Sequence, residues 1–138
     1  MATTEELRAR LRQVTVIDDH ASILEEVVNG LDEVQEPALV DEVLAVFERC
    51  AGQDDYGLFS SLQQWIERLP DTPGVRASVQ ASLLRHPTWK VIEMIGGFAD
   101  NGAQAAALLE QVQREGTFTD PRYRPDWLQK RITELKSS

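Results

Sequence analysis

The stretch LFSSLQQWIERLPDTPGVRASVQASLLRHPTW, residues 58–89, decides the fold class. Its first part repeats apolar side chains at spacings of three and four, which places them on one face of an α-helix: Leu58, Phe59, Leu62, Trp65, Ile66 and Leu69. Pro70 breaks this pattern, and a second helical pattern runs from Thr72-Pro73 to the next break at His86-Pro87. Two successive helical patterns separated by proline breaks indicate a chain built from consecutive short helices.

The same helical period extends over the rest of the chain. A capping box, Thr3-x-x-Glu6, predicts the start of the first helix, and Asp18 or Asp19 is expected to cap the second. Asp54 or Asp55 is expected to open the fourth helix. The run at 14–17, VTVI, is the one strand-like segment. The sequence therefore predicts an all-α fold of about 7–8 helices, over roughly 3–14, 18–34, 37–51, 54–69, 72–85, 87–99, 102–115 and 125–136.

The later helices group into pairs: 38–50 with 55–69, 74–85 with 87–99, and 102–115 with 125–136. Pro87-Thr88-Trp89 and Pro125-Asp126-Trp127 share a P-x-W pattern, each at the start of a helix. Pairs that begin about 28 to 36 residues apart are typical of helical solenoids. We expect one domain over 1–138, with acidic N-terminal helices in 1–36 and three helix pairs in 37–136. The alternative is an irregular bundle in which the prolines only start helices.

Two segments resemble HEAT repeats. Asp71-x-Pro73-x-Val75-Arg76-x-x-Val79-x-x-x-Leu83 is similar to the second-helix signature of that family. Asn101-Gly102, followed by the apolar positions of 105–112, is similar to its first helix. The resemblance covers residues 38–136 and implies antiparallel helix pairs stacked as a short HEAT-like solenoid.

Charge is distributed unevenly along the chain. Of its net charge of −9, residues 1–60 carry a balance of −10 and residues 61–138 a balance of +1. Between Asp18 and Asp55, Arg49 is the only Lys or Arg. An acidic surface repels nucleic acid and anionic lipid and attracts basic proteins, so we expect no direct nucleic-acid or membrane binding.

Short acidic proteins built on a few such repeats resemble the immunity proteins of bacterial toxin systems. This resemblance implies a cytoplasmic, non-enzymatic inhibitor that binds a cognate toxin with a basic surface and needs no cofactor. The acidic residues expected to contact the partner are Asp18, Asp19, Glu25, Glu26, Asp32, Glu33, Glu36, Asp41 and Glu42. The alternative interpretation of these residues is a solvated outer face.

Catalytic and metal-binding patterns were weighed against this binding function. Asp18-Asp19-His20 with Glu25-Glu26 lacks the spacing of zinc and calcium motifs, and a helix cap explains it more simply. Glu33-x-x-Glu36 has a magnesium-type spacing, but Pro37 follows at once. The sequence thus predicts no catalytic or metal residues. A helical-repeat adaptor or scaffold, and a small metal-dependent hydrolase, are the alternative functions.

The remaining unusual residues are interpreted as structural. Trp65 has apolar neighbours at helical spacing, which predicts a core position, and the core is also favoured over a binding surface for Trp89 and Trp127. Cys50 is the only cysteine, so it forms no intramolecular disulfide, and we expect a small core residue in a reducing cytoplasm. The polar start of the sequence predicts no signal peptide, and no stretch is apolar enough for a transmembrane helix.

Overall fold

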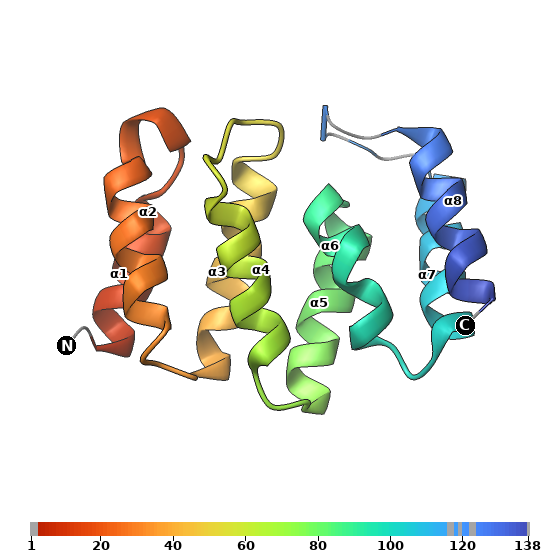
Figure 1. The fold of residues 1–138 in the computed structure, drawn as a ribbon, viewed down its shortest axis with the longest axis horizontal. Coiled ribbons are helices and arrows are strands. Elements are labelled where there is room, and N and C mark those ends of the chain that lie inside the picture. Colours follow the sequence, from red (N-terminus) through yellow and green to blue (C-terminus); the bar gives the residue numbers. More distant parts are fainter. Residues whose placement is uncertain (1–2, 116–117, 119, 122–123, 138) are drawn as a thin grey trace. The chain divides into compact units, whose positions relative to one another are not determined.

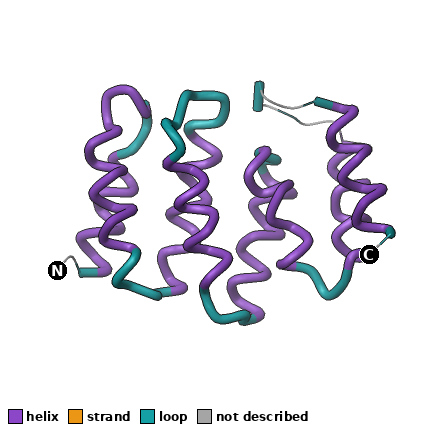
Figure 2. Tube along the Cα trace, viewed as in Figure 1, coloured by secondary structure: helices purple, strands orange, loops and turns teal. Residues whose placement is uncertain are grey.

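The computed structural model describes residues 3–115, 118, 120–121 and 124–137. Within these ranges the regular structure is entirely helical, which confirms the all-α prediction (Figures 1 and 2). The VTVI run forms no strand, because it supplies the α1–α2 connection and the first residue of α2. The elements are α1 (Thr4–Gln13), α2 (Ile17–Leu31), η1 (Pro37–Leu39), α3 (Val40–Arg49), α4 (Leu58–Arg68), α5 (Pro73–Arg85), α6 (Trp89–Met94), η2 (Ile95–Phe98), α7 (Gly102–Glu115) and α8 (Pro125–Lys136), where η denotes a 3-10 helix.

Two compact units make up the chain, Met1–Asp71 and Thr72–Ser138, here called unit 1 and unit 2. Unit 1 contains α1 to α4 and unit 2 contains α5 to α8. Helices are packed as pairs, as the sequence predicts. The stacking of all pairs into one solenoid, and a single domain over 1–138, stay predictions.

Unit 1 is built from two helix pairs. Helix α1 packs on α2 and α3 packs on α4, while α1 also contacts α3 and α2 contacts α4, so the unit has two layers (Figure 1). The N-terminal helices, expected outside the repeats, are therefore themselves a packed pair. The rings of Phe47 and Phe59 meet edge to face in the core, with centroids 5.1 Å apart. Other buried apolar side chains are Leu7, Leu11, Leu24, Val27, Leu31, Val43, Leu44, Leu62 and Ile66.

The caps of unit 1 only partly follow the local sequence. The Glu6 amide donates to Thr3 Oγ1 at 3.2 Å, as a capping box requires. The prediction that Asp18 or Asp19 caps α2 is wrong, because this helix begins at Ile17 with Val16 as its N-cap and no side-chain cap. The Ile17 amide instead donates to Gln53 Oε1, at 2.7 Å, on the α3–α4 loop. A distant side chain thus takes the place of the local carboxylate.

The fourth helix begins later than predicted, at Leu58. Tyr56 and Gly57 have φ values of 51° and 83°, in the left-handed region, so the chain cannot be α-helical through them. Asp55 still satisfies a backbone amide in the first turn of α4, because its Oδ2 accepts a hydrogen bond from the Phe59 amide at 2.9 Å. The observed loop leaves the Tyr56 side chain exposed.

Unit 2 likewise contains two packed pairs. Helix α5 packs on α6 and η2, α7 packs on α8, and α7 also contacts α5 and η2. The helix predicted over 87–99 is α-helical only to Met94 and then tightens to the 3-10 form, which holds Gly96 and Gly97. Glycine is a poor α-helix former, which agrees with this change. The main buried side chains are Val75, Val79, Leu83, Val91, Ile92, Ile95, Ala105, Ala106, Leu109, Val112, Leu128, Ile132 and Leu135.

In the part of the chain that the structure describes, no helix combines the length and the apolar character needed to cross a bilayer.

Candidate functional site

The nine carboxylates predicted to contact a partner lie on α2, on the turn after it, and at the start of α3. All are exposed except Glu36 and Glu42, which are partly buried. Their distribution is wide: Asp19 lies in the first turn of α2 and Glu33 follows the end of this helix, whose 15 residues span about 20 Å at 1.5 Å per residue. Asp41 lies on α3, in the other layer of unit 1. The structure therefore does not gather the nine residues into one patch.

Several of these carboxylates are already neutralised by arginines from outside the acidic region. Glu26 pairs with Arg10 at 3.4 Å, and Asp32 pairs with Arg68 at 3.4 Å. The charge balance of residues 18–55 therefore overstates the negative charge that a partner meets.

Glu42 and Glu36 have structural roles. The Glu42 side chain, only 18% exposed, accepts two hydrogen bonds from Arg12, at 2.7 and 3.1 Å, and Arg8 lies 4.0 Å away. Glu42 also raises the pKa of Arg12 through this bond and through its charge. The Glu36 carboxylate accepts from the Ala38 amide at 3.1 Å and caps η1.

Four predicted carboxylates form no ion pair within the described ranges. Asp19, Glu25, Glu33 and Asp41 are exposed and have no hydrogen-bond or ion-pair partner among the described residues. Unpaired exposed carboxylates set the long-range potential that a basic protein meets on approach.

At one end of unit 1, the α1–α2 connection and the α3–α4 loop are held together by hydrogen bonds. Arg49 donates from Nη2 to the Leu11 carbonyl at 2.9 Å and from Nε to the Val14 carbonyl at 3.2 Å. Gln53 accepts from the Ile17 amide and donates to the Thr15 carbonyl at 3.3 Å. These bonds tie the end of α1 and the α1–α2 connection to the end of α3 and to Gln53 after it, so the α3–α4 loop lies against the start of α2.

Tyr56 is presented at this end. Tyr56 is 63% exposed, and its hydroxyl donates to Asp18 Oδ1 at 2.6 Å. Its backbone amide donates to Asp54 Oδ1 at 3.1 Å. The bond and the charge of Asp18 raise the pKa of the Tyr56 phenol. We call Tyr56 with Asp18, Asp19 and Asp54 the Tyr56 cluster.

Sequence reasoning found Asp18 and Asp19 but missed Tyr56. A lone tyrosine in a loop gives no periodic signal, and its left-handed backbone and its bond to a residue 38 positions away are visible only in three dimensions.

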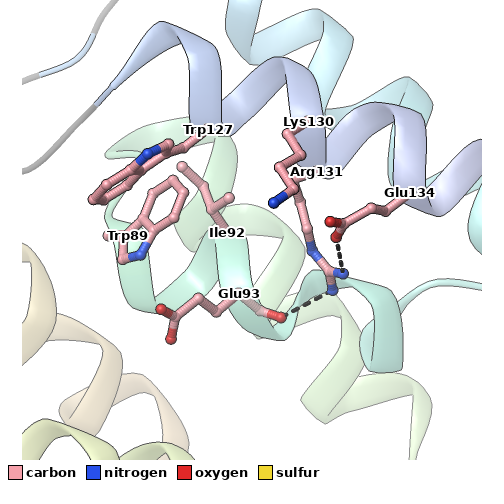
Figure 3. Close-up of a pocket in the computed structure, with 7 residues that line it drawn as sticks. All are labelled: Trp89, Ile92, Glu93, Trp127, Lys130, Arg131 and Glu134. Atoms are coloured by element: carbon pink, nitrogen blue, oxygen red, sulfur yellow. Dashed lines mark hydrogen bonds and ion pairs between the residues drawn. The ribbon is translucent and has the colours of Figure 1, made fainter.

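Unit 2 contains a second candidate, a groove of about 270 Å³ between α6 and α8 (Figure 3). Trp89 and Trp127 lie at one end with ring centroids 5.3 Å apart and planes tilted by 50°. Trp127 is 51% exposed, so its core interpretation is wrong, whereas Trp65 is 3% exposed and its core prediction is confirmed. The lining residues are Trp89, Ile92, Glu93, Trp127, Lys130, Arg131 and Glu134.

Helical geometry explains why Trp127 faces outward. Leu128, Ile132 and Leu135 form the buried stripe of α8. Trp127 lies about 100° around the helix from Leu128, off this stripe. Trp89, the first residue of α6, is half-buried and supports the Trp127 ring.

The rest of the groove is lined by charged groups. Arg131 donates from Nη2 to the Glu93 carbonyl at 3.1 Å, and its Nη1 lies 3.8 Å from a Glu134 oxygen. Arg131 Nε is buried and has no hydrogen-bond partner within the described ranges. Lys130 is exposed and likewise has no ion-pair partner in the described structure. The Glu93 carboxylate pairs with Lys90 at 3.6 Å.

Compared with protein-family models, with curated proteins and with solved structures, the chain finds no match.

The residues considered for metal binding do not form a ligand set. His20 Nδ1 accepts from the Val16 amide at 3.3 Å, beside Asp18 and Asp19. Glu33 and Glu36 follow the end of α2 and do not share a helix face. Among the described residues, no group of three or more His, Cys, Asp or Glu is placed to hold a metal ion.

Proposed function

We propose that this protein acts by binding another protein, as a cytoplasmic immunity protein that neutralises a cognate bacterial toxin with a basic surface. The observation that carries the proposal is the Tyr56 cluster, an exposed aromatic ring among carboxylates. The HEAT-like segments at 71–83 and 101–112 support the further proposal that the helix pairs form a short solenoid.

Tyr56 has the properties of an interface anchor. Tyrosine is enriched among the residues that contribute most to binding, because it buries a large, rigid surface at a low cost in side-chain entropy. The bond to Asp18 restricts the ring further before any partner arrives. An anchor restricted in this way loses less entropy on binding.

The surrounding charge supplies the second part of the proposal. Asp18 and Asp54 accept hydrogen bonds from Tyr56, and Asp19 follows Asp18 on α2. The exposed Glu25, Glu33 and Asp41 extend the negative field over unit 1. Carboxylates in this arrangement raise the association rate of a basic protein and disfavour acidic ones. A toxin that acts on nucleic acid needs a cationic groove, which an acidic inhibitor can occupy.

The test begins with co-purification from the native host, which identifies the partner. Co-expression of the full chain should then suppress the partner's toxicity. Binding kinetics of the purified complex should show an association rate that falls as salt rises from about 0.05 to 0.5 M. A captured protein that is not toxic, or whose toxicity the chain does not reduce, contradicts the immunity function.

Matched variants test the Tyr56 cluster itself. Tyr56→Ala should weaken binding at least about 30-fold, as expected for a hot-spot residue, mainly through faster dissociation. Asp19→Lys should slow association and flatten its salt dependence. Glu67→Lys, at an exposed carboxylate of α4, is the control and should change neither rate by more than about twofold. Association and dissociation rates equal to those of the wild type in both Tyr56→Ala and Asp19→Lys would show that the partner does not bind at the Tyr56 cluster.

Reversal of Asp41 and Glu42 tests the wider acidic field, but the two positions are not equivalent. Glu42→Lys would also break the bonds to Arg12, so a loss of binding there could reflect altered folding. Asp41 is exposed and unpaired among the described residues, and Asp41→Lys is therefore the cleaner variant.

A further inference from the structure

We infer that the groove between α6 and α8 is a second protein-docking site, whose occupant is a partner segment that places a carboxylate beside an aliphatic or aromatic side chain. This inference concerns unit 2 alone and does not depend on the function proposed for unit 1.

The apolar half of the site is the tryptophan pair with Ile92. Trp127 exposes about half of its surface, and Trp89 lies against it within ring-contact distance. Figure 3 shows both rings at the same end of the groove, with Ile92 between them and Lys130. Covering these rings removes a large apolar area from water, and paired tryptophans are among the strongest anchors in protein interfaces.

The charged half specifies the occupant. Lys130 is exposed and has no ion-pair partner in the described structure, whereas Arg131 is held by the Glu93 carbonyl and by Glu134. Of the two acidic residues in the lining, Glu93 is paired with Lys90, and its carboxylate points away from Lys130 and Arg131 in Figure 3. Glu134 lies 3.8 Å from Arg131, a loose contact. Lys130 therefore presents an unpaired positive charge beside an apolar surface, and a carboxylate complements that charge.

Size and charge favour a protein segment over a nucleic acid, although stacked tryptophans and cations can also bind bases. A groove of about 270 Å³ is at the small end of ligand sites and suits one or two side chains. Glu93 and Glu134 line the groove and would repel a polyphosphate chain. A single carboxylate can bind the one unpaired ammonium, that of Lys130, and the two glutamates repel it less because it carries less charge than a polyphosphate.

Indole N–H signals provide a direct test. The ¹⁵N-labelled full chain has three such signals, and Trp65 is an internal control because its Nε1 donates to the Val34 carbonyl at 2.9 Å in unit 1. We would titrate the blocked peptides acetyl-ELEFE-amide and acetyl-KLKFK-amide. The acidic peptide should shift the signals of Trp89 and Trp127 but not that of Trp65, and the basic peptide should shift none of them.

Three variants distinguish a loss of charge from a loss of folding. Lys130→Glu should lower the affinity for the acidic peptide about tenfold or more. The control is Arg114→Glu, at an exposed arginine of α7 with no ion-pair partner among the described residues, and it should leave this affinity unchanged. Trp127→Ala should keep the wild-type circular dichroism spectrum, because the ring is half exposed, but should no longer bind the acidic peptide.

Three results would overturn the inference. The first is the absence of any indole shift with the acidic peptide. The second is equal binding of the acidic and basic peptides, since the cations would then play no part. The third is a shift of Trp89 and Trp127 by a ten-residue oligothymidylate but not by the acidic peptide, which would make the groove a nucleic-acid site.

Discussion

Replacing Trp65 with phenylalanine tests how unit 1 positions its acidic turn. Trp65 lies on α4, is 3% exposed, and donates from Nε1 to the Val34 carbonyl at 2.9 Å. Val34 belongs to the turn after α2 that carries Asp32 and Glu33. The indole therefore links the core of unit 1 to a segment of the acidic surface.

The expected loss of stability in Trp65→Phe has two parts. The hydrogen bond contributes about 1 kcal/mol net, because its loss leaves the Val34 carbonyl to find water. The smaller phenyl ring buries less apolar surface and leaves space in the core, which costs about 1 kcal/mol more. The free energy of unfolding should thus fall by about 2 kcal/mol, a sizeable share of the roughly 5–15 kcal/mol typical of a small protein.

Urea unfolding followed by circular dichroism at 222 nm measures this change. With an m value of about 2 kcal/mol/M, the midpoint should fall by about 1 M. Trp127→Phe is the matched control, since the exposed ring retains its contact with Trp89, and should shift the midpoint by less than about 0.3 M. Equal shifts in the two variants would refute the assignment of one indole to the core and the other to the surface.

Three further predictions follow from other parts of the structure. The pKa of Tyr56 is raised, so its bond to Asp18 is complete at neutral pH, persists beyond the ordinary phenol pKa of about 10, and is lost as the pH rises through the raised value. Absorbance titration at 295 nm should therefore show one tyrosine ionising earlier in Asp18→Asn than in the wild type, and an unchanged titration would contradict the bond. Burial raises the pKa of the Cys50 thiol, and the positive charge of Arg49 opposes this with a smaller effect. An aromatic disulfide reagent at pH 8 should therefore react with the urea-unfolded protein on the order of 100-fold faster than with the folded protein. Equal rates would place the thiol at the surface. A Cβ added at Gly96 would lie 3.1 Å from the Arg131 guanidinium and from the Leu135 side chain, whereas one at Gly97 would meet nothing within 4 Å. Gly96→Ala should accordingly be about 1 kcal/mol less stable than Gly97→Ala in urea, and the reverse order would contradict the close packing at residue 96.

The candidate sites were predictable only in part. Asp18 and Asp19 could be selected from the sequence, because an excess of acidic residues in one region can be counted. The neutralisation of Glu42 by Arg12 could not, because the two residues are 30 positions apart and meet only when α1 packs on α3. The sequence favours a core position for Trp127, since a ring in the first turn of a helix often covers the joint between helix pairs, but the direction in which this ring faces is decided only by the packing of α8.

The sequence by itself determined the all-α class and the approximate bounds of the helices, since apolar spacing, proline breaks and caps are local properties of consecutive residues. The pairing of neighbouring helices also followed from the order and spacing of the helical segments along the chain. Tertiary structure alone decided which charges remain unpaired, how Gln53 replaces a local cap on α2, and where Tyr56 and the Trp89–Trp127 pair reach the surface. These features depend on contacts between residues distant in the chain, and such contacts exist only after the helices have packed.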